Sequence, residues 1–341
     1  MHTSTSPSSS TSATATTTPQ TVLDIQDLSI EFPIYKGAVR AVNGVTVRIA
    51  RGEVVGIVGE SGSAKSVTAM MAMRLLPEGR FQVTGGSVTL LGRDVVAARE
   101  QDMLDIRGRD VSMIFQEPLT ALNPTQRIER QMLEVIRLHR PCSKQEARAL
   151  AIRLLGDMRI ADPEQVLQRY PFELSGGMRQ RILIALAFSC DPKIIIADEP
   201  TTALDVTVQR QVLQLMRAKA RDLGTAILFI SHDLALVSQF CDRVYVMYAG
   251  SVVEAGPTAA VLGTPMHPYT RALLRALPEC ALPGELLQSI PGTVPNLSQP
   301  LLGCSFAPRC PQAQAQCQHK PPLQAVASHH QSACWFAKET L

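Results

Sequence analysis

The sequence predicts an α/β fold in which helices cover both faces of a largely parallel β-sheet. Apolar runs typical of buried strands alternate with helical stretches between about residues 54 and 249. The first of these runs, Val54–Val58, ends directly in a glycine-rich loop, GESGSAKS at 59–66. A second glycine pair lies in LSGGMRQ at 174–180 and opens another helical stretch. A strand, a glycine-rich loop and a helix in this order are typical of a phosphate-binding fold.

Each expected element follows from the local pattern. Residues 22–58 alternate apolar and polar positions between turn signals, which indicates several strands. A helix at 67–76 follows the glycine-rich loop, and Pro77 ends it. The pattern then predicts strands at 85–91 and 111–115, helices over 126–160 and a helix at 175–189. Beyond these it predicts strand 194–197, helix 206–222, strand 225–231, helix 234–240 and strand 244–249.

The 341 residues divide into three parts by composition. Residues 1–20 are rich in Ser and Thr and have little to bury, which predicts a disordered tail. Residues 21–262 carry the α/β pattern, with a helical subdomain at about 118–182. From about residue 263 proline becomes frequent, so we expect residues 263–341 to form a small C-terminal domain.

The composition argues against two classes of protein. The net charge is +3, and no dense Lys/Arg run is interleaved with aromatic residues, which argues against a nucleic-acid partner. No apolar run is long enough to span a membrane, and the N-terminus lacks the basic and apolar regions of a secretory signal. We therefore expect a cytoplasmic chain that acts at any membrane through other subunits.

The loop at 59–66 has the residue types that hold phosphate. Backbone N–H groups of such a loop, together with the N-terminus of the next helix, bind anionic oxygens. Lys65 is expected to neutralise the β- and γ-phosphates of ATP, and the Ser66 hydroxyl to bind Mg²⁺. Ala64 stands where the usual pattern has glycine, and its Cβ is costly if the position needs φ > 0. The predicted nucleotide-binding residues of the loop are Gly59, Glu60, Ser61, Gly62, Ser63, Ala64, Lys65 and Ser66.

Two adjacent carboxylates follow the apolar strand at 194–197. Burying acids at a strand end is costly unless they have a partner. We expect Asp198 to hold Mg²⁺ through water, and Glu199 to orient and polarise the water that attacks the phosphate. The alternative for the pair taken alone is an ordinary strand end with solvated acids.

The glycine pair at the start of the helix at 175–189 predicts a second anion site. Gly176 and Gly177 expose backbone N–H groups, and Ser175 adds a hydroxyl donor. For this peptide taken alone, a helix N-cap is the better interpretation.

Four further residues are candidates for the nucleotide site. Gln116 follows strand 111–115, where its side chain would sense Mg²⁺ and the attacking water. Asp205 begins a helix and is either a nucleotide-site residue or a plain N-cap. His232 follows strand 225–231 and is either a γ-phosphate contact or a satisfied core histidine. Tyr35 lies ahead of the glycine-rich loop and is the candidate to stack on adenine.

Eight cysteines in a cytosolic chain argue against a disulfide framework. Four of them cluster near the C-terminus with the spacing C-x5-C-x6-C-x16-C: Cys304, Cys310, Cys317 and Cys334. The tight C-x2–4-C pairs of zinc sites are absent, and iron–sulfur ligation tolerates looser spacing. Spacing alone leaves Zn²⁺, an iron–sulfur cluster and free thiols equally open, and His319, His329 and His330 are possible substitute ligands.

These motifs together resemble the ATPase subunits of bacterial ABC importers, in the oligopeptide/dipeptide/nickel permease family. The matching stretches are SMIFQEPLTALNP (112–124), IADEPTTALDV (196–206), SHDLALV (231–237), HPYTRALLRALP (267–278) and PGTVPNL (291–297). The resemblance implies an ABC-type P-loop NTPase with a RecA-like core, an antiparallel β subdomain, a helical signature subdomain and a small Cys-rich extension. It also implies an ATPase that powers import of di- or oligopeptides.

The resemblance further implies partners and a cofactor. In this family the signature peptide, here LSGGMRQ at 174–180, completes the ATP site of an opposing cassette. This implies a second ATPase subunit, either a homologous chain or a second copy. Two transmembrane permeases and an extracytoplasmic solute-binding protein are also implied, so the chain is expected on the cytoplasmic face of the cell membrane. Dipeptide-type members with a matching cysteine set carry a [4Fe–4S] cluster, so the resemblance favours that group over Zn²⁺.

Alternative interpretations stay open. A soluble cassette that acts on nucleic acid or ribosomes usually has two cassettes or a long insertion, and this chain has neither. Ala64 leaves open a weakly catalytic cassette that binds ATP beside a competent partner. Because selectivity resides in other subunits, nickel or a metallophore is an alternative solute to a peptide.

Overall fold

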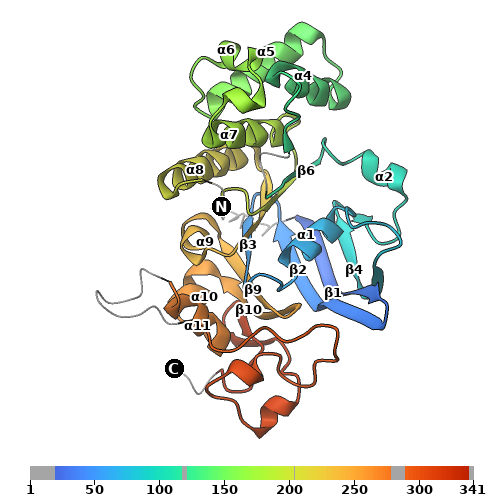
Figure 1. Ribbon diagram of the computed structural model, residues 1–341, viewed down its shortest axis with the longest axis vertical. Coiled ribbons are helices and arrows are strands. Elements are labelled where there is room, and N and C mark those ends of the chain that lie inside the picture. Colours follow the sequence, from blue (N-terminus) through green and yellow to red (C-terminus); the bar gives the residue numbers. More distant parts are fainter. Residues whose placement is uncertain (1–19, 117–120, 203, 278–288, 338–341) are drawn as a thin grey trace, which may run out of the picture.

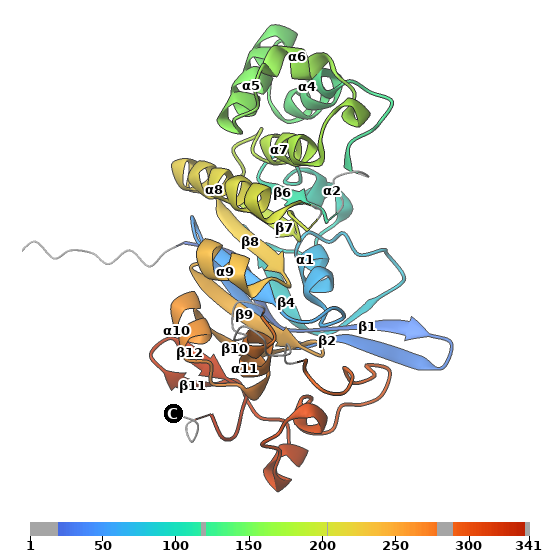
Figure 2. The same cartoon turned by 60° about the vertical axis from the view of Figure 1, so that its left-hand side comes forward.

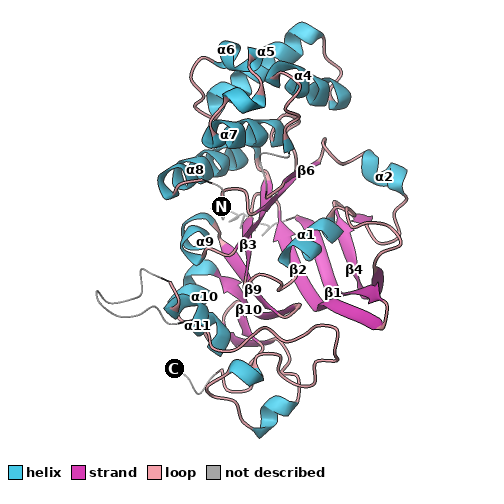
Figure 3. Ribbon diagram, viewed as in Figure 1, coloured by secondary structure: helices cyan, strands magenta, loops and turns pink. Residues whose placement is uncertain are grey.

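Two β-sheets organise residues 20–116, 121–202, 204–277 and 289–337, which are the residues that the computed structural model describes (Figure 1). The predicted disordered tail lies outside these residues, apart from Gln20. The larger sheet has eight strands in the order β11-β12-β10-β9-β3-β8-β7-β6, and the smaller has four in the order β2-β1-β4-β5. Figure 3 shows the smaller sheet beside the larger one, with α1 next to both.

The centre of the larger sheet is parallel, as the sequence predicts. It consists of β3 (Val54–Val58), β6 (Val111–Ile114), β7 (Ile194–Asp198), β8 (Ala226–Ser231) and β9 (Arg243–Tyr248). Strand β3 pairs in parallel with β8 and β9, and β7 pairs in parallel with β6 and β8. Since parallel strands point the same way, the segments that follow β3, β7 and β8 meet at one edge of the sheet.

Both faces of this sheet are buried. Along β3, Val54 and Val58 belong to one apolar core and Val55 and Ile57 to the other, as the two-residue repeat of a strand requires. The second core also contains residues of α1 (Lys65–Ala72), which packs against strands of both sheets. Strand and helix thus hold the glycine-rich loop between them from both ends.

The smaller sheet is antiparallel throughout. Its strands are β1 (Thr21–Ile34), β2 (Gly37–Ala50), β4 (Gln82–Leu90) and β5 (Arg93–Asp94). The alternating pattern at 22–58 therefore resolves into two long strands followed by β3.

Helices between β6 and β7 form a layer at one end of the molecule that shares its apolar core with the larger sheet (Figure 2). They are α4 (Ile128–His139), α5 (Lys144–Asp157), α6 (Pro163–Gln168) and α7 (Gly176–Ala187), with η1 (Pro171–Glu173) before α7. The short α2 (Glu100–Leu104) precedes β6. Helix α8 (Val206–Leu223) packs on α7, and α9 (Leu234–Phe240) packs on α8 and on the parallel sheet.

The C-terminal residues extend the larger sheet. Strand β10 (Ser251–Pro257) pairs antiparallel with β9, and α10 (Thr258–Gly263) and α11 (Pro268–Arg275) follow it. After η3 (Ala307–Arg309) and η4 (Ala315–Gln318), β11 (Gln324–Ala327) and β12 (His330–Ser332) form a hairpin. Strand β12 pairs with β10, so the segment after residue 263 is continuous with the core sheet.

Most predicted elements lie within a few residues of their expected positions, and α9 coincides with its prediction. Helix α1 ends earlier than predicted, and two residues beyond it Arg74 adopts φ 51°, which is not a helical angle. Among the described residues, no helix has both the length and the apolar character that crossing a membrane requires.

Candidate nucleotide-binding site

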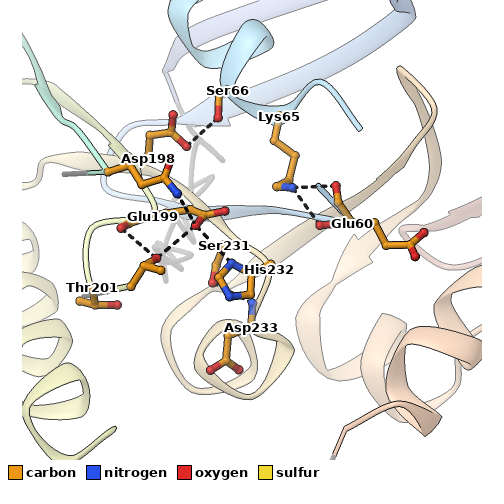
Figure 4. A network of polar contacts seen from close by, with 12 residues as sticks. Glu60, Lys65, Ser66, Asp198, Glu199, Thr201, Ser231, His232 and Asp233 are labelled. Atoms are coloured by element: carbon orange, nitrogen blue, oxygen red, sulfur yellow. Dashed lines mark hydrogen bonds and ion pairs between the residues drawn. The ribbon is translucent and has the colours of Figure 1, made fainter. Parts of the chain in front are cut away.

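The glycine-rich loop joins the end of β3 to the start of α1 and folds around Lys65. The ammonium Nζ of Lys65 donates to the carbonyl oxygens of Gly59 at 2.8 Å and Glu60 at 3.0 Å (Figure 4). Burial lowers the pKa of Lys65, and the carboxylates of Glu199, Asp198 and Glu60 oppose that shift. The lysine is therefore a buried cation held by loop carbonyls and surrounded by acids.

The loop is shaped to receive an anion. The Ser63 hydroxyl is buried and has no hydrogen-bond partner among the residues that the structure describes, although buried polar atoms are almost always paired. Gly59 has φ 152°, and a Cβ there would lie 2.1 Å from the Met247 carbonyl oxygen. A phosphate oxygen in the loop would supply the missing partner of Ser63.

Ala64 adopts a left-handed backbone conformation, with φ 74° and ψ 21°. This confirms that the position is one where glycine is favoured and where a Cβ is costly. The residue directly precedes the first residue of α1, so any strain lies where the helix N-terminus faces the loop.

Ser66 and Asp198 meet at the predicted magnesium position. The Ser66 hydroxyl donates to Asp198 Oδ1 at 3.0 Å, from α1 to the end of β7 (Figure 4). Asp198 is 7% exposed, and burial raises the pKa of its carboxyl. A hydroxyl beside a carboxylate suits the hard-cation chemistry of Mg²⁺.

Glu199 is the centre of a second cluster. Its Oε2 accepts hydrogen bonds from Gln116 Nε2 and Thr202 Oγ1, both at 3.1 Å, and lies 3.2 Å from His232 Nδ1. These partners follow β6, β7 and β8 in the chain, so the parallel sheet brings them together at one edge. Figure 4 shows His232 beside Glu199. The side chain of Glu199 is 14% exposed and that of His232 is 54% exposed, so His232 is not a core histidine.

Ser175 and Asp205 both act as helix N-caps within this chain. Ser175 Oγ accepts from the Met178 backbone N–H at 3.3 Å, and Asp205 Oδ1 accepts from the Val208 N–H at 3.0 Å. Gly176 and Gly177 form the first turn of α7. Helix α7 packs against α5, α8 and β6, whereas α1 packs against β2, β4, β7 and β8. The signature peptide therefore lies on a different part of the molecule from the glycine-rich loop of the same chain.

Tyr35 lies in the turn between β1 and β2 and is 99% exposed. No contact joins its ring to the described site residues, so adenine stacking stays a prediction.

The four clustered cysteines line one small cavity in the segment that follows residue 263, which we call the C-terminal domain as predicted. All four are free thiols, and burial raises the pKa of Cys304, Cys310 and Cys334. Among the residues with described positions, no group of three or more His, Cys, Asp or Glu side chains is arranged to hold a metal ion. His330, a predicted substitute ligand, instead contacts Glu254 at 2.8 Å. These side-chain positions therefore give the predicted cluster no support.

Three contacts of the predicted site residues were not expected from the sequence. Thr202 contacts Glu199, and two residues of the C-terminal domain, Tyr269 and Arg309, contact Glu60 in the glycine-rich loop. Tyr269 lies 209 residues from Glu60 and Arg309 lies 249 residues from it, so no local pattern signals either contact.

Comparison with known proteins agrees with this geometry. The ABC transporter family profile matches residues 42–202, and the profile described as oligopeptide/dipeptide transporter, C-terminal region, matches residues 253–317. The probable D,D-dipeptide transport ATP-binding protein DdpD of Escherichia coli is 60% identical over 94% of this chain and 98% of its own length. The oligopeptide transport ATP-binding protein OppD of Salmonella typhimurium is 44% identical over 94% of this chain and 95% of its own.

Solved structures define the class of fold. The dimeric structure of MJ0796, described as a bacterial ABC transporter cassette, has a TM-score of 0.61 and 25% identity, covering 69% of this chain and 98% of that one. The fold is thus an ABC cassette, a mixed α/β P-loop NTPase. Within that class, the chain belongs to the family of oligopeptide/dipeptide transport ATP-binding proteins.

Proposed function

We propose that this chain hydrolyses Mg²⁺–ATP and so powers the import of short peptides through an ABC permease. The observation that carries the proposal is the Glu199 cluster, in which one carboxylate contacts Gln116 and His232 beside the Ser66–Asp198 pair. Family membership supports the same activity.

Each residue has a role in this proposal. Backbone N–H groups of the loop and the Lys65 ammonium bind the phosphates, and Ser66 and Asp198 hold the Mg²⁺ that neutralises them. Glu199 orients and polarises the attacking water, Gln116 positions it, and His232 contacts the γ-phosphate. Tyr35 stacks on the adenine.

The test is steady-state ATP hydrolysis by the purified chain together with its partner subunits. Glu199→Gln keeps the shape and removes the base, so we expect kcat to fall by about 100-fold or more while ATP still binds. The matched control is Glu134→Gln, at an exposed position on α4. Equal activity of the two variants would refute the role of Glu199.

The signature residues act on a second cassette. Ser175, Gly176, Gly177 and Asp205 complete the nucleotide site of an opposing ATPase subunit, either a homologous chain or a second copy. Their separation from the loop of the same chain supports this part of the proposal. Two membrane permeases and an extracytoplasmic binding protein complete the importer, and the chain works at the cytoplasmic face of the cell membrane.

The solute that we propose is a dipeptide. The 60% identical relative is named for transport of D,D-dipeptides, so these are the first compounds to test. A strain lacking this chain should lose uptake of a labelled D,D-dipeptide and regain it with the wild-type chain but not with Glu199→Gln. Loss of nickel or metallophore uptake, with peptide uptake intact, would favour the alternative solute.

We also propose that Cys304, Cys310, Cys317 and Cys334 hold a metal group, with [4Fe–4S] as the first candidate and Zn²⁺ as the second. The family resemblance of the cysteine set carries this proposal. The side-chain positions around the cavity that the four thiols line give it no support, so no part of the ATPase chemistry is derived from the group. Iron, zinc and acid-labile sulfide would be measured on anaerobically purified protein. About four iron and four sulfide per chain, lost in Cys310→Ser, would support the cluster, and absence of all metals would refute both candidates.

A further inference from the structure

Residues of the C-terminal domain form hydrogen bonds with Glu60 of the glycine-rich loop. Arg309 in η3 donates from Nη1 to Glu60 Oε2 at 2.8 Å and from Nη2 to Glu60 Oε1 at 3.1 Å. The Tyr269 hydroxyl, on α11, accepts from the Glu60 backbone N–H at 2.9 Å. Side chain and backbone of the same loop residue are thus held by residues that follow in the chain more than 200 positions later.

The Arg309 contact is built into the interior. Its side chain is 4% exposed, and the guanidinium also donates to the carbonyl oxygens of Pro291 at 2.8 Å and Ile290 at 3.2 Å. Its Nη1 lies 3.3 Å from the Tyr248 hydroxyl. A two-pronged arginine–carboxylate pair whose arginine is buried and has further acceptors fixes geometry far better than a fully exposed ion pair does.

Tyr269 is equally fixed. The residue is fully buried, and its ring packs against Tyr248 at 4.6 Å and Phe306 at 5.4 Å between centroids. The hydroxyl therefore presents one acceptor at a set position under the loop.

Glu60, whose position these contacts fix, is also a hydrogen-bond partner of Lys65. The Glu60 carbonyl is one of the two acceptors that hold the Lys65 ammonium (Figure 4). One residue thus contacts the phosphate-binding lysine through its carbonyl and the C-terminal domain through its carboxylate and N–H.

We propose that Arg309 and Tyr269 are positioning residues that preorganise the glycine-rich loop for ATP. The inference rests on the proposed ATP-binding function of that loop. Without the two contacts the loop samples more conformations, and the nucleotide must bear the cost of ordering it. Affinity for ATP falls, whereas turnover at saturating ATP is retained because the bound nucleotide restores the loop.

The test is calorimetric titration of the full chain with Mg²⁺–ATP, together with KM and kcat for hydrolysis. Arg309→Ala and Tyr269→Phe should each raise Kd and KM by roughly three- to tenfold, with kcat within about twofold of wild type. Arg309→Lys should recover part of the loss, because it keeps the charge but not the fork. The matched control is Arg275→Ala, an exposed arginine on α11 that lines the same surface cavity as Arg309.

A double-mutant cycle separates positioning from general stability. Glu60→Gln combined with Arg309→Ala should weaken ATP binding no more than the worse single variant, because each of the two changes already breaks the Glu60–Arg309 ion pair. Additive losses, or an Arg309→Ala variant that folds normally and binds ATP as Arg275→Ala does, would overturn the proposal. If Arg309→Ala does not fold, the Kd values of Arg309→Lys and Tyr269→Phe in the same titration test the proposal instead. Lys65→Ala reports on the nucleotide site itself, since unchanged ATP binding by that variant would refute the proposed function instead.

Discussion

Ala64 has a backbone conformation that is unfavourable for alanine. Its φ of 74° is in the left-handed region, which costs a non-glycine residue about 1–2 kcal/mol. The loop holds this conformation because the buried Lys65 side chain and α1 fix the backbone on its C-terminal side.

Replacing Ala64 by glycine should therefore stabilise the folded chain. Glycine gains entropy in the unfolded state, which offsets part of the relief, so we expect a net gain of up to about 1 kcal/mol. Urea unfolding of the nucleotide-free chain measures this change, and ATPase assays show whether turnover also rises. Ala69→Gly in α1 is the contrasting variant and should be destabilising. Stability of Ala64→Gly below wild type would contradict the argument.

Asp198 gives a prediction that depends on pH. Burial raises its folded-state pKa above the ordinary 3.8, so the folded chain disfavours the ionised carboxylate once the pH exceeds the unfolded value. Asp198→Asn should therefore stabilise the nucleotide-free chain at pH 7, and the gain should disappear as the pH falls below about 3.8.

The same substitution should lower Mg²⁺-dependent hydrolysis by about 100-fold, because the amide has no charge to hold the metal. Urea unfolding across the pH range and ATPase assays measure the two effects. A variant that is less stable than wild type at pH 7 would contradict the burial argument.

At the scale of single residues, the sequence predicts the positions of candidate site residues that lie at the ends of strands and helices. Lys65 begins α1, Asp198 ends β7 and Glu199 directly follows that strand, so motif spacing alone locates them in the fold. Arg309 and Tyr269 reach the same loop only through the tertiary fold, and nothing in their neighbourhood marks them as partners of Glu60.

At the scale of elements, β10 is joined to the C-terminal domain through Glu254. This fully buried residue accepts from the Met266 and His267 backbone N–H groups and contacts His330 of β12. One carboxylate therefore ties a strand, the segment before α11 and the terminal hairpin.

Glu254→Ala should unfold this part of the molecule readily. Removing the carboxylate leaves buried donors unpaired, so we expect a loss of about 3 kcal/mol or more. Urea denaturation gives the value, and limited proteolysis should show cleavage beyond residue 263 first. Glu78→Ala, at a side chain that is 75% exposed, is the control and should change stability little. Equal stability of the two variants would refute the role of Glu254.

Helices and strands with a clear pattern of apolar residues can be predicted from the sequence, and short exposed strands cannot. Strands β3, β7 and β8 are buried apolar runs, so their positions follow from composition. Strand β11 is mostly exposed, at Gln324–Ala327, and carries no apolar alternation that would distinguish it from a loop.

For the whole molecule, the two-cassette proposal gives the separation of α7 from the loop a consequence, since one chain would then supply two half-sites. If an opposing cassette completes each site, hydrolysis by the isolated chain depends on association. We expect specific ATPase activity to rise with concentration between about 0.1 and 20 µM, in parallel with a dimer fraction measured by light scattering. Ser175→Arg should abolish the activity without weakening ATP binding to the monomer. A monomer with constant specific activity over this range would contradict the two-cassette site.

The terminal hairpin also changes the border of the larger sheet. Without β12, strand β10 would present unpaired backbone N–H and C=O groups along its open side. Open strand borders of this kind invite pairing with other chains and lead to aggregation. The hairpin replaces that border with β11, which has only four residues. We therefore expect loss of the hairpin to expose the β10 edge and to lower solubility even before it affects the nucleotide site.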